Sequence, residues 1–195
     1  MDSDLQEPVP KYNFIEPQQY LSEERKAVVK HEYYQGEVFA MSGASFNHNK
    51  IFSNLFIELG LLLKGKKCQP YGSDLRVHVK ENSLYTYPDI VLICEDPLFT
   101  DDENDTITNP TVIIEILSKS TERYDRIEKF ALCRSISGLK EYILVDSRKL
   151  RVEHYLKTDD NKWLLTEFSK VTEQLSFPSI GSAISLSAIY DGISF

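Results

Sequence analysis

The order of apolar and polar residues predicts one long helix packed against a buried sheet. Between residues 47 and 63, apolar side chains recur at helical spacing, and Ser45 or Asn47 can cap this helix, which we expect to end near Gly65. In the segment 111–117, β-branched residues fill both faces, a pattern typical of a strand buried on both sides. We expect the helix to belong to the hydrophobic core.

Shorter patterns predict the remaining elements. Residues 68–80 alternate and indicate a single strand whose polar face carries Arg76, His78 and Lys80, either as a row facing phosphates or as a solvated face. We also expect a helix that begins near residues 16–17, a hairpin turning at 35–36, strands at 88–93 and 141–146, a helix over 122–136, a hairpin over 151–166, and a short helix at 186–190.

Length and composition are those of one globular domain. The chain has 195 residues, of which 42% are hydrophobic, so we expect a poorly ordered tail over residues 1–11 and a single domain over 12–195. Cys68, Cys94 and Cys133 lack the short paired spacing of a zinc site, and we interpret them as reduced core thiols of a cytoplasmic protein. No apolar run approaches the roughly 20 residues of a membrane-spanning helix, so we expect no membrane association.

The net charge of −8 argues against a large surface for non-specific phosphate binding. A local basic stripe or bound cations can still act at an interface, so nucleic acid is not excluded as a partner. The acidic segment 101–105 lacks the ordered oxygen spacing of an EF-hand and is interpreted as a solvated loop.

Glu115 is the anomaly of the pattern, because it lies between Ile114 and Ile116 in an apolar strand. Burying such a carboxylate costs several kcal/mol unless a cation, a metal or strong donors offset the cost. Asp89, at the start of a neighbouring strand, can meet Glu115 across the ladder, and a divalent cation between the two would relieve their repulsion. The alternative is a core ion pair of Glu115 with Arg123 or Arg126.

These residues and several others form an ordered set of motifs from about residue 12 to 155. The set resembles the PD-(D/E)xK nuclease superfamily, with its restriction-endonuclease-like fold, and within it the small stand-alone "putative restriction endonuclease" family. The motifs are Tyr33-x-x-Gly36-Glu37, Met41-Ser42-Gly43, His48, Pro88-Asp89, Glu115-x-Leu117-Ser118-x-Ser120-Thr121, Asp125-x-x-x-Lys129 and Glu141-Tyr142.

The resemblance implies a fold, which is an α/β fold with a mixed sheet. Its restriction-endonuclease-like core has the order αβββαβ, here with added N-terminal and C-terminal β hairpins. The superfamily pattern places a lysine two residues after the glutamate, where this chain has Leu117. The resemblance implies that the lysine has migrated to the next helix, as Lys129, which lies one helical turn after Asp125. Lys119, which is nearer to Glu115 in the sequence, is the alternative candidate for this lysine.

The resemblance also implies a function, which is metal-dependent hydrolysis of DNA. Asp89, Glu115 and the Ile116 carbonyl would hold Mg²⁺ or Mn²⁺, and Lys129 would assist the attacking water. His48 is either an auxiliary group of the site or a local capping residue. A catalytically inactive relative that binds nucleic acid or protein is the alternative. Cutting both strands requires two sites, which suggests a homodimer, whereas a nickase needs only one.

The sequence leaves the roles of three further acidic residues open. Glu32 and Glu37 lie on the expected N-terminal hairpin and are either solvated strand residues or part of the site. Asp74 either approaches the carboxylates or serves the turn at Gly72-Ser73.

Overall fold

The computed structural model of the protein describes residues 14–195, so the tail expected over residues 1–11 lies outside the described residues. The helices and strands are α1 (Pro17–Glu24), β1 (His31–Tyr34), β2 (Glu37–Ala40), α2 (Phe46–Leu63), β3 (Gln69–Gly72), β4 (Arg76–Val79), β5 (Leu84–Thr86), β6 (Ile90–Ile93), β7 (Thr106–Ile107), β8 (Val112–Leu117), the π-helix η1 (Tyr124–Lys129), α3 (Phe130–Cys133), β9 (Glu141–Asp146), β10 (Val152–Lys157), β11 (Trp163–Phe168), β12 (Gln174–Phe177), the 3-10 helix η2 (Pro178–Ile180), β13 (Ser182–Ser185) and α4 (Leu186–Ile189).

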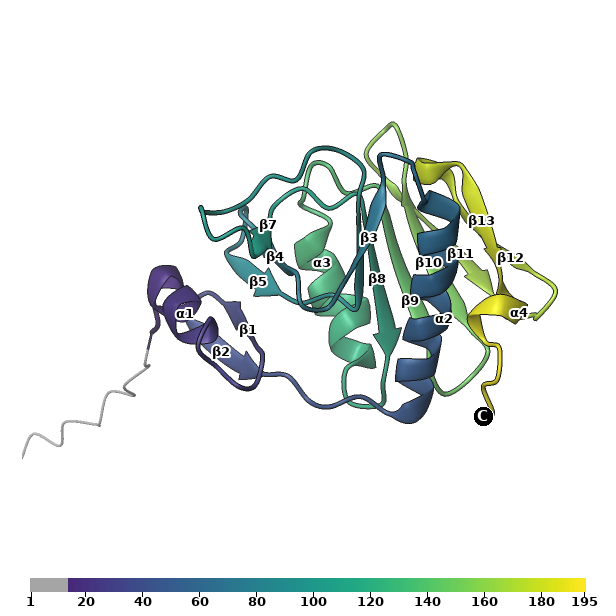
Figure 1. The fold of residues 1–195 in the computed structure, drawn as a ribbon, viewed down its shortest axis with the longest axis horizontal. Coiled ribbons are helices and arrows are strands. Elements are labelled where there is room, and N and C mark those ends of the chain that lie inside the picture. Colours follow the sequence, from purple (N-terminus) through teal and green to yellow (C-terminus); the bar gives the residue numbers. More distant parts are fainter. Residues whose placement is uncertain (1–13) are drawn as a thin grey trace, which may run out of the picture.

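A six-stranded mixed sheet in the order β11-β10-β9-β8-β6-β3 forms the centre of the molecule. Only β8 and β9 are parallel, and the other neighbours are antiparallel. Helix α2 packs on one face, and η1 with α3 lies on the other (Figure 1). The succession α2, β3, β6, β8, α3, β9 has the order αβββαβ, and the expected mixed α/β fold is confirmed.

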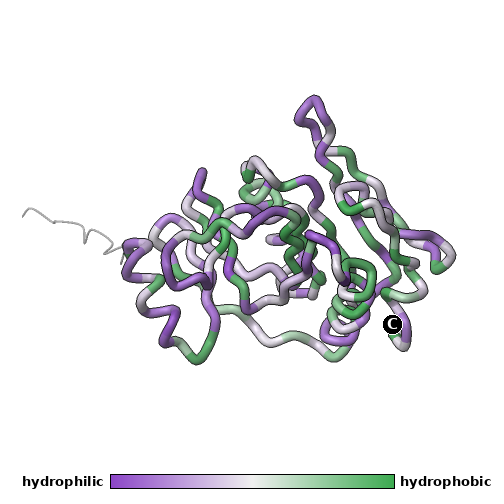
Figure 2. Tube along the Cα trace, turned by 45° about the horizontal axis from the view of Figure 1, so that its top comes forward, coloured by the Kyte–Doolittle hydropathy of each residue, from purple (hydrophilic) through white to green (hydrophobic). Residues whose placement is uncertain are grey.

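Period-two alternation divides β8 between two hydrophobic cores. Ile114 and Ile116 pack with α2, whereas Ile113 and Leu117 pack toward α3. Glu115 therefore lies on the α3 face of the sheet. In Figure 2, hydrophobic stretches run through the interior of the molecule, and hydrophilic stretches lie at the projecting hairpin tips.

A second sheet, in the order β2-β1-β5-β4-β7, lies beside the first and carries the N-terminal hairpin. The turn between β1 and β2 has positive φ at both Gln35 and Gly36, as a two-residue hairpin turn requires. Tyr20 stacks on Tyr33, Tyr85 meets both rings at an angle, and this aromatic cluster attaches α1 to the sheet.

The prediction of a single strand over residues 68–80 is wrong. The chain turns at 73–75, and β3 and β4 belong to different sheets. Arg76 is buried, and its guanidinium group donates to Thr106, Tyr87 and Asp105. The ring of His78 stacks on Tyr85 with 3.9 Å between centroids. Arg76 is therefore fixed inside the fold, His78 is half-buried against Tyr85 and Lys80 is exposed, so these side chains form neither a row facing phosphates nor a solvated face.

The helix expected over residues 122–136 is also shorter and differently wound. It begins at Glu122 as predicted, continues as the π-helix η1, and ends early with α3 at Cys133. Ile127, an apolar residue of this segment, is 56% exposed. At the C-terminus, the short helix α4 is present, and it follows the hairpin of β12 and β13, which the pattern did not predict.

Two of the three cysteines form a disulfide, Cys68–Cys94, which corrects the expectation of reduced thiols at these positions. The cause is the strand register: Gln69 pairs with Ile93 across β3 and β6, so the residues that flank this pair are brought opposite each other. Cys133 is free and buried. Within residues 14–195, no helix has the length and apolar character needed to cross a membrane.

Candidate functional site

Asp89 and Glu115 lie side by side at the end of the central sheet. Ile90 pairs with Ile114 across antiparallel β6 and β8, which brings the preceding Asp89 opposite Glu115. The backbone N–H of Asp89 donates to Glu115 Oε2 at 3.4 Å, and the N–H of Ile116 donates to Asp89 Oδ2 at 2.7 Å. Ile116 has no strand partner on this side, because β6 begins only at Ile90.

Lys129 supplies a buried cation to Glu115. Its Nζ lies 2.8 Å from Glu115 Oε1, 3.0 Å from Glu32 Oε1 and 3.9 Å from Asp125 Oδ1. The Lys129 and Glu115 side chains are 3% and 4% exposed. The contact joins the ammonium group to Oε1 as a buried ion pair, while Oε2 accepts from the Asp89 N–H.

The site holds more negative than positive charge. Burial raises the pKa of Glu115 well above its usual range, and the neighbouring Asp125 and Asp89 raise it further, against the opposing effect of Lys129. Burial also raises the pKa of Asp125. For Lys129, burial favours the neutral form, but Glu115, Glu32 and Asp125 together raise its pKa well above the ordinary value, so the amine is an ammonium.

His48 reaches the same site from the first turn of α2. Ser45 caps this helix by accepting a hydrogen bond from the backbone N–H of His48. The His48 ring places Nε2 3.2 Å from Asp89 Oδ2, while its Nδ1 is buried without a hydrogen-bond partner. The imidazole therefore faces the carboxylates and does not serve as the cap itself.

The structure brings together Asp89, Glu115, Ile116, Lys129 and His48, the five residues singled out from the sequence. It also adds Glu32, which is buried and bound to Lys129. Only the strand position of Glu32 was visible in the sequence, where a solvated acid was the simpler interpretation, and that interpretation is wrong for this residue.

The other site candidates from the sequence lie outside this cluster of side chains. Glu37 and Lys119 are exposed, and the Asp74 side chain is 96% exposed and pairs with Lys30. The alternative pairing of Glu115 with Arg123 or Arg126 is also wrong. Arg126 binds Glu153 at 2.9 Å, and Arg123 lies 4.0 Å from Glu128.

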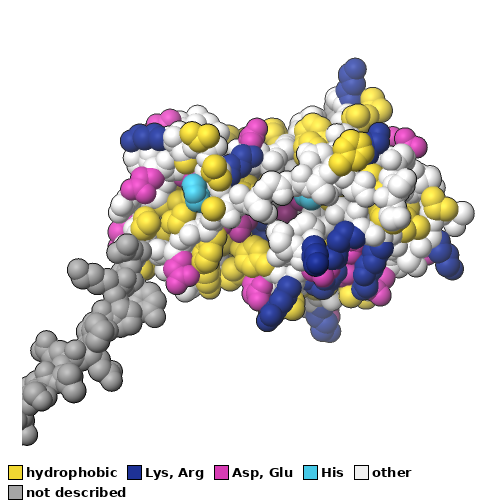
Figure 3. All heavy atoms as spheres, turned by 90° about the horizontal axis from the view of Figure 1, so that it is seen from below, with side chains coloured by type: hydrophobic (Ala, Val, Ile, Leu, Met, Phe, Trp, Pro, Cys, Tyr) yellow, Lys and Arg dark blue, Asp and Glu magenta, His cyan; other side chains and the backbone are white. Residues whose placement is uncertain are grey.

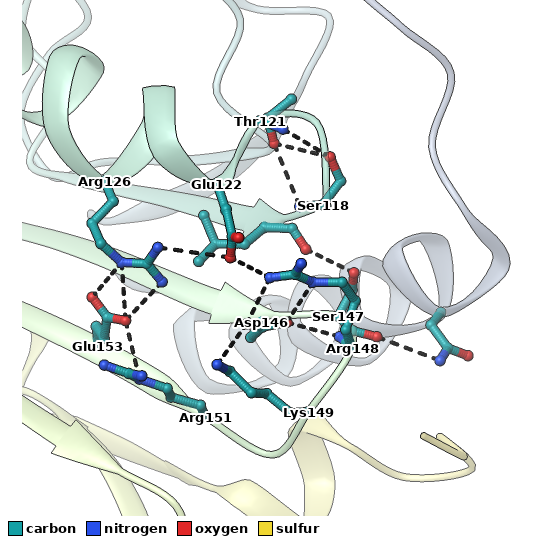
Figure 4. A network of polar contacts seen from close by, with 12 residues as sticks. Ser118, Thr121, Glu122, Arg126, Asp146, Ser147, Arg148, Lys149, Arg151 and Glu153 are labelled. Carbon is teal, nitrogen blue, oxygen red and sulfur yellow. Dashed lines mark hydrogen bonds and ion pairs between the residues drawn. The ribbon is translucent and has the colours of Figure 1, made fainter.

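A chain of ion pairs borders the site where β8 and β9 end. Arg148 contacts both Glu122 and Asp146, and Glu153 is held between Arg126 and Arg151 (Figure 4). The loop that carries Arg148 is joined to β8 by a hydrogen bond from the Ser147 N–H to the Leu117 carbonyl, and to α2 by Asn47.

This end of the molecule is seen from below in Figure 3, where Lys and Arg side chains alternate with carboxylates. Arg123 and Lys149 are the more exposed cations of this region, with side chains 84% and 56% exposed. Because most of its other arginines are paired with acids, the region offers few cations that are available to an anionic partner.

The donor atoms of the site fit a hard cation better than a soft one. Among residues 14–195, no three His, Cys, Asp or Glu side chains form a ready-made metal site. Two adjacent carboxylates remain, those of Asp89 and Glu115, which are linked through the backbone N–H groups of Asp89 and Ile116. Mg²⁺ commonly takes one or two carboxylates and completes its shell with carbonyl oxygens and waters. The residues present therefore fit Mg²⁺ or Mn²⁺.

Two comparisons with individual proteins extend over most of the chain. It is 40% identical to the uncharacterized protein sll1609 of Synechocystis sp. strain PCC 6803 over 82% of this chain and 90% of that protein. A second uncharacterized protein of the same organism, slr1290, is 36% identical over 96% of both chains.

Among solved structures, one described as a putative nuclease belonging to DUF820 from Anabaena variabilis ATCC 29413 matches with a TM-score of 0.71. It covers 90% of this chain and 97% of that chain at 19% identity, which shows a shared fold. Residues 17–188 match the family Uma2, described as "Putative restriction endonuclease". This chain therefore belongs to the Uma2 family.

Proposed function

We propose that this protein is a metal-dependent nuclease that hydrolyses phosphodiester bonds of DNA. Family membership and the fold support a nuclease-like role. The observation that carries the finer proposal is the position of Lys129, whose ammonium group lies 2.8 Å from Glu115, the residue whose other carboxylate oxygen accepts from the Asp89 N–H. Two acids and a lysine thus meet at one sheet end although the lysine is not on β8.

Asp89, Glu115 and the carbonyl of Ile116 would hold Mg²⁺ or Mn²⁺. In a strand, the N–H and C=O groups of one residue point to the same side, and the Ile116 N–H already points to Asp89. When bound, the cation would offset charge on the phosphate and lower the pKa of an attacking water. The excess of buried acids over cations supports such a ligand, since a further positive charge would relieve their repulsion.

Lys129 would stay protonated and donate to the attacking water or to a phosphate oxygen. Its high pKa excludes the role of general base at neutral pH, because a base must release its proton near the working pH. His48 would orient Asp89 through the 3.2 Å contact of its Nε2. Electrostatic contributions of this kind commonly amount to a few kcal/mol each.

A catalytically inactive binding protein is the second candidate, and Leu117 is the observation that motivates it, because the usual lysine position is apolar and buried. The position of Lys129 favours the enzyme, since an ammonium group in contact with Glu115 replaces the missing charge. A homodimer would allow both DNA strands to be cut, whereas a monomer would act as a nickase.

The decisive experiment is a nicking assay on supercoiled plasmid with Mg²⁺, Mn²⁺ or EDTA. We expect conversion to open circles with either metal and none with EDTA, and no conversion by the Asp89→Asn variant. A wild-type protein that binds plasmid in a gel-shift assay without cutting it under any of these conditions would support the inactive alternative.

A further inference from the structure

Glu32 contacts Lys129 from the second sheet, whereas Asp89 and Glu115 lie at the central sheet. It lies on β1, whereas Lys129 closes η1, 97 residues further along the chain. Nζ lies between Glu32 Oε1 at 3.0 Å and Glu115 Oε1 at 2.8 Å, so the ammonium group bridges acids from both sheets.

The Glu32 carboxylate is itself fixed from two further sides. The hydroxyl of Thr86, on β5, donates to Oε1, and the hydroxyl of Tyr124, the first residue of η1, donates to Oε2 at 2.8 Å. Burial works against its ionisation, but Lys129 and these donors hold the pKa of Glu32 below its ordinary value. Glu32 is thus a buried anion, and each of its carboxylate oxygens has a hydrogen-bond or ion-pair partner. Such complete pairing distinguishes a fixed carboxylate from one that only touches Lys129.

We propose that Glu32 is a positioning residue of the nuclease site: it holds the ammonium group of Lys129 over Glu115, so that the N-terminal hairpin completes the site. This inference rests on the proposed function. Lysine has a flexible four-carbon stem, so its charge is located by its partners and not by its backbone. Glu115 and Asp125 alone would leave one side of the ammonium group without a partner.

The competing explanation is that Glu32 only attaches the second sheet to η1. Both roles predict a loss of stability when the carboxylate is removed, so stability cannot distinguish them. A positioning role predicts in addition a fall in kcat with little change in KM, because Lys129 would act on the transition state and not on the bound substrate.

The test compares Glu32→Gln, Glu32→Asp and the control Glu37→Gln, which alters an exposed acid on the same hairpin. We expect Glu32→Gln to lose 10- to 100-fold in kcat, the range typical of groups that orient a functional side chain. Glu32→Asp keeps the charge and should recover part of the loss, and Glu37→Gln should match the wild type. Thermal melts select a temperature at which all variants are folded.

A second readout does not depend on activity. In ¹⁵N NMR spectra, we expect the ammonium group of Lys129 to give a signal protected from solvent exchange, assigned by its loss in Lys129→Arg. Glu32→Gln should shift this signal and speed its exchange, whereas Glu37→Gln should not. An unchanged signal, or wild-type kcat in Glu32→Gln, would overturn the positioning role. If the wild type cuts no DNA, the proposed function fails, and the signal still decides whether Glu32 holds Lys129.

Discussion

The ammonium group of Lys129 lies 2.8 Å from the carboxylate of Glu115, although Lys129 closes a π-helix and Glu115 lies within β8. The lysine therefore enters the site from the layer that covers the sheet. This arrangement explains how Leu117, two residues after the glutamate, can be a core residue without leaving the site uncharged.

Replacing Glu115 by Gln removes a buried carboxylate whose ionised form is already disfavoured by burial and by Asp125 and Asp89. We expect a folded protein, because the change relieves charge repulsion and keeps the shape of the side chain. Binding of Mg²⁺ measured by calorimetry and plasmid nicking should both disappear. Nicking at the wild-type rate would refute the role of this residue.

Replacing Lys129 by Met leaves Glu32, Glu115 and Asp125 buried without their shared cation. We expect a loss of about 3–5 kcal/mol in the free energy of unfolding, as is typical when one partner of a buried pair is removed. Urea denaturation measures this loss. The double variant Lys129→Met/Glu115→Gln should lose less than the sum of the two single variants, and strict additivity would contradict the contact.

The exposed cations Arg123 and Lys149 are expected to contact the DNA backbone. Replacing either by Ala should raise KM and leave kcat unchanged. The slope of log binding constant against log salt should fall by about 1 for each removed phosphate contact. Filter binding over a range of salt concentrations gives this slope. A slope identical to that of the wild type would exclude the residue from the interface.

His78 makes the stability depend on pH. Burial, assisted by Lys80, lowers the pKa of His78 to about 4, whereas an unfolded histidine titrates near about 6.5. Between these values the unfolded chain binds a proton that the folded protein does not, so stability falls as the pH decreases through this window. His78→Gln should show a smaller fall in urea denaturation between neutral and acidic buffers. An equal fall would contradict the assignment.

The disulfide Cys68–Cys94 closes a loop with a sequence separation of 26 residues. Loop-closure entropy predicts that reduction costs about 3 kcal/mol of stability. Urea denaturation with and without a reductant measures the difference. In Cys68→Ser, where no disulfide can form, the reductant should have no effect; an effect of equal size there would show that it acts elsewhere.

The main elements of the fold could be predicted from local patterns, because their causes are local. The apolar stripe of α2 with its cap at Ser45, the run of β-branched residues in β8 and the turn at Gln35-Gly36 each have their physical cause within a few residues. The meeting of Asp89 and Glu115 also follows from alternation once their strands are neighbours.

The features that could not be predicted depend on contacts between distant segments. Glu32 has the sequence context of a solvated strand acid, and only the packing of the second sheet buries it against Lys129. Arg76 continues an alternating pattern, yet it is buried because Asp105 and Tyr87 supply partners from other segments. The pairing of Cys68 with Cys94 depends on the register of β3 with β6, which two short strands do not reveal.

The π-helical winding of η1 constrains the length of the chain between Tyr124 and Lys129. A π-turn accommodates more residues than an α-turn, and each residue of an α-helix advances the side chains by about 100° around the axis. With the number of residues unchanged, regular α-helical winding would carry Lys129 further around the axis and turn it away from Glu115. The wide turn and the number of residues in it therefore belong together, because losing the π-winding without losing a residue would separate the cation from its acids.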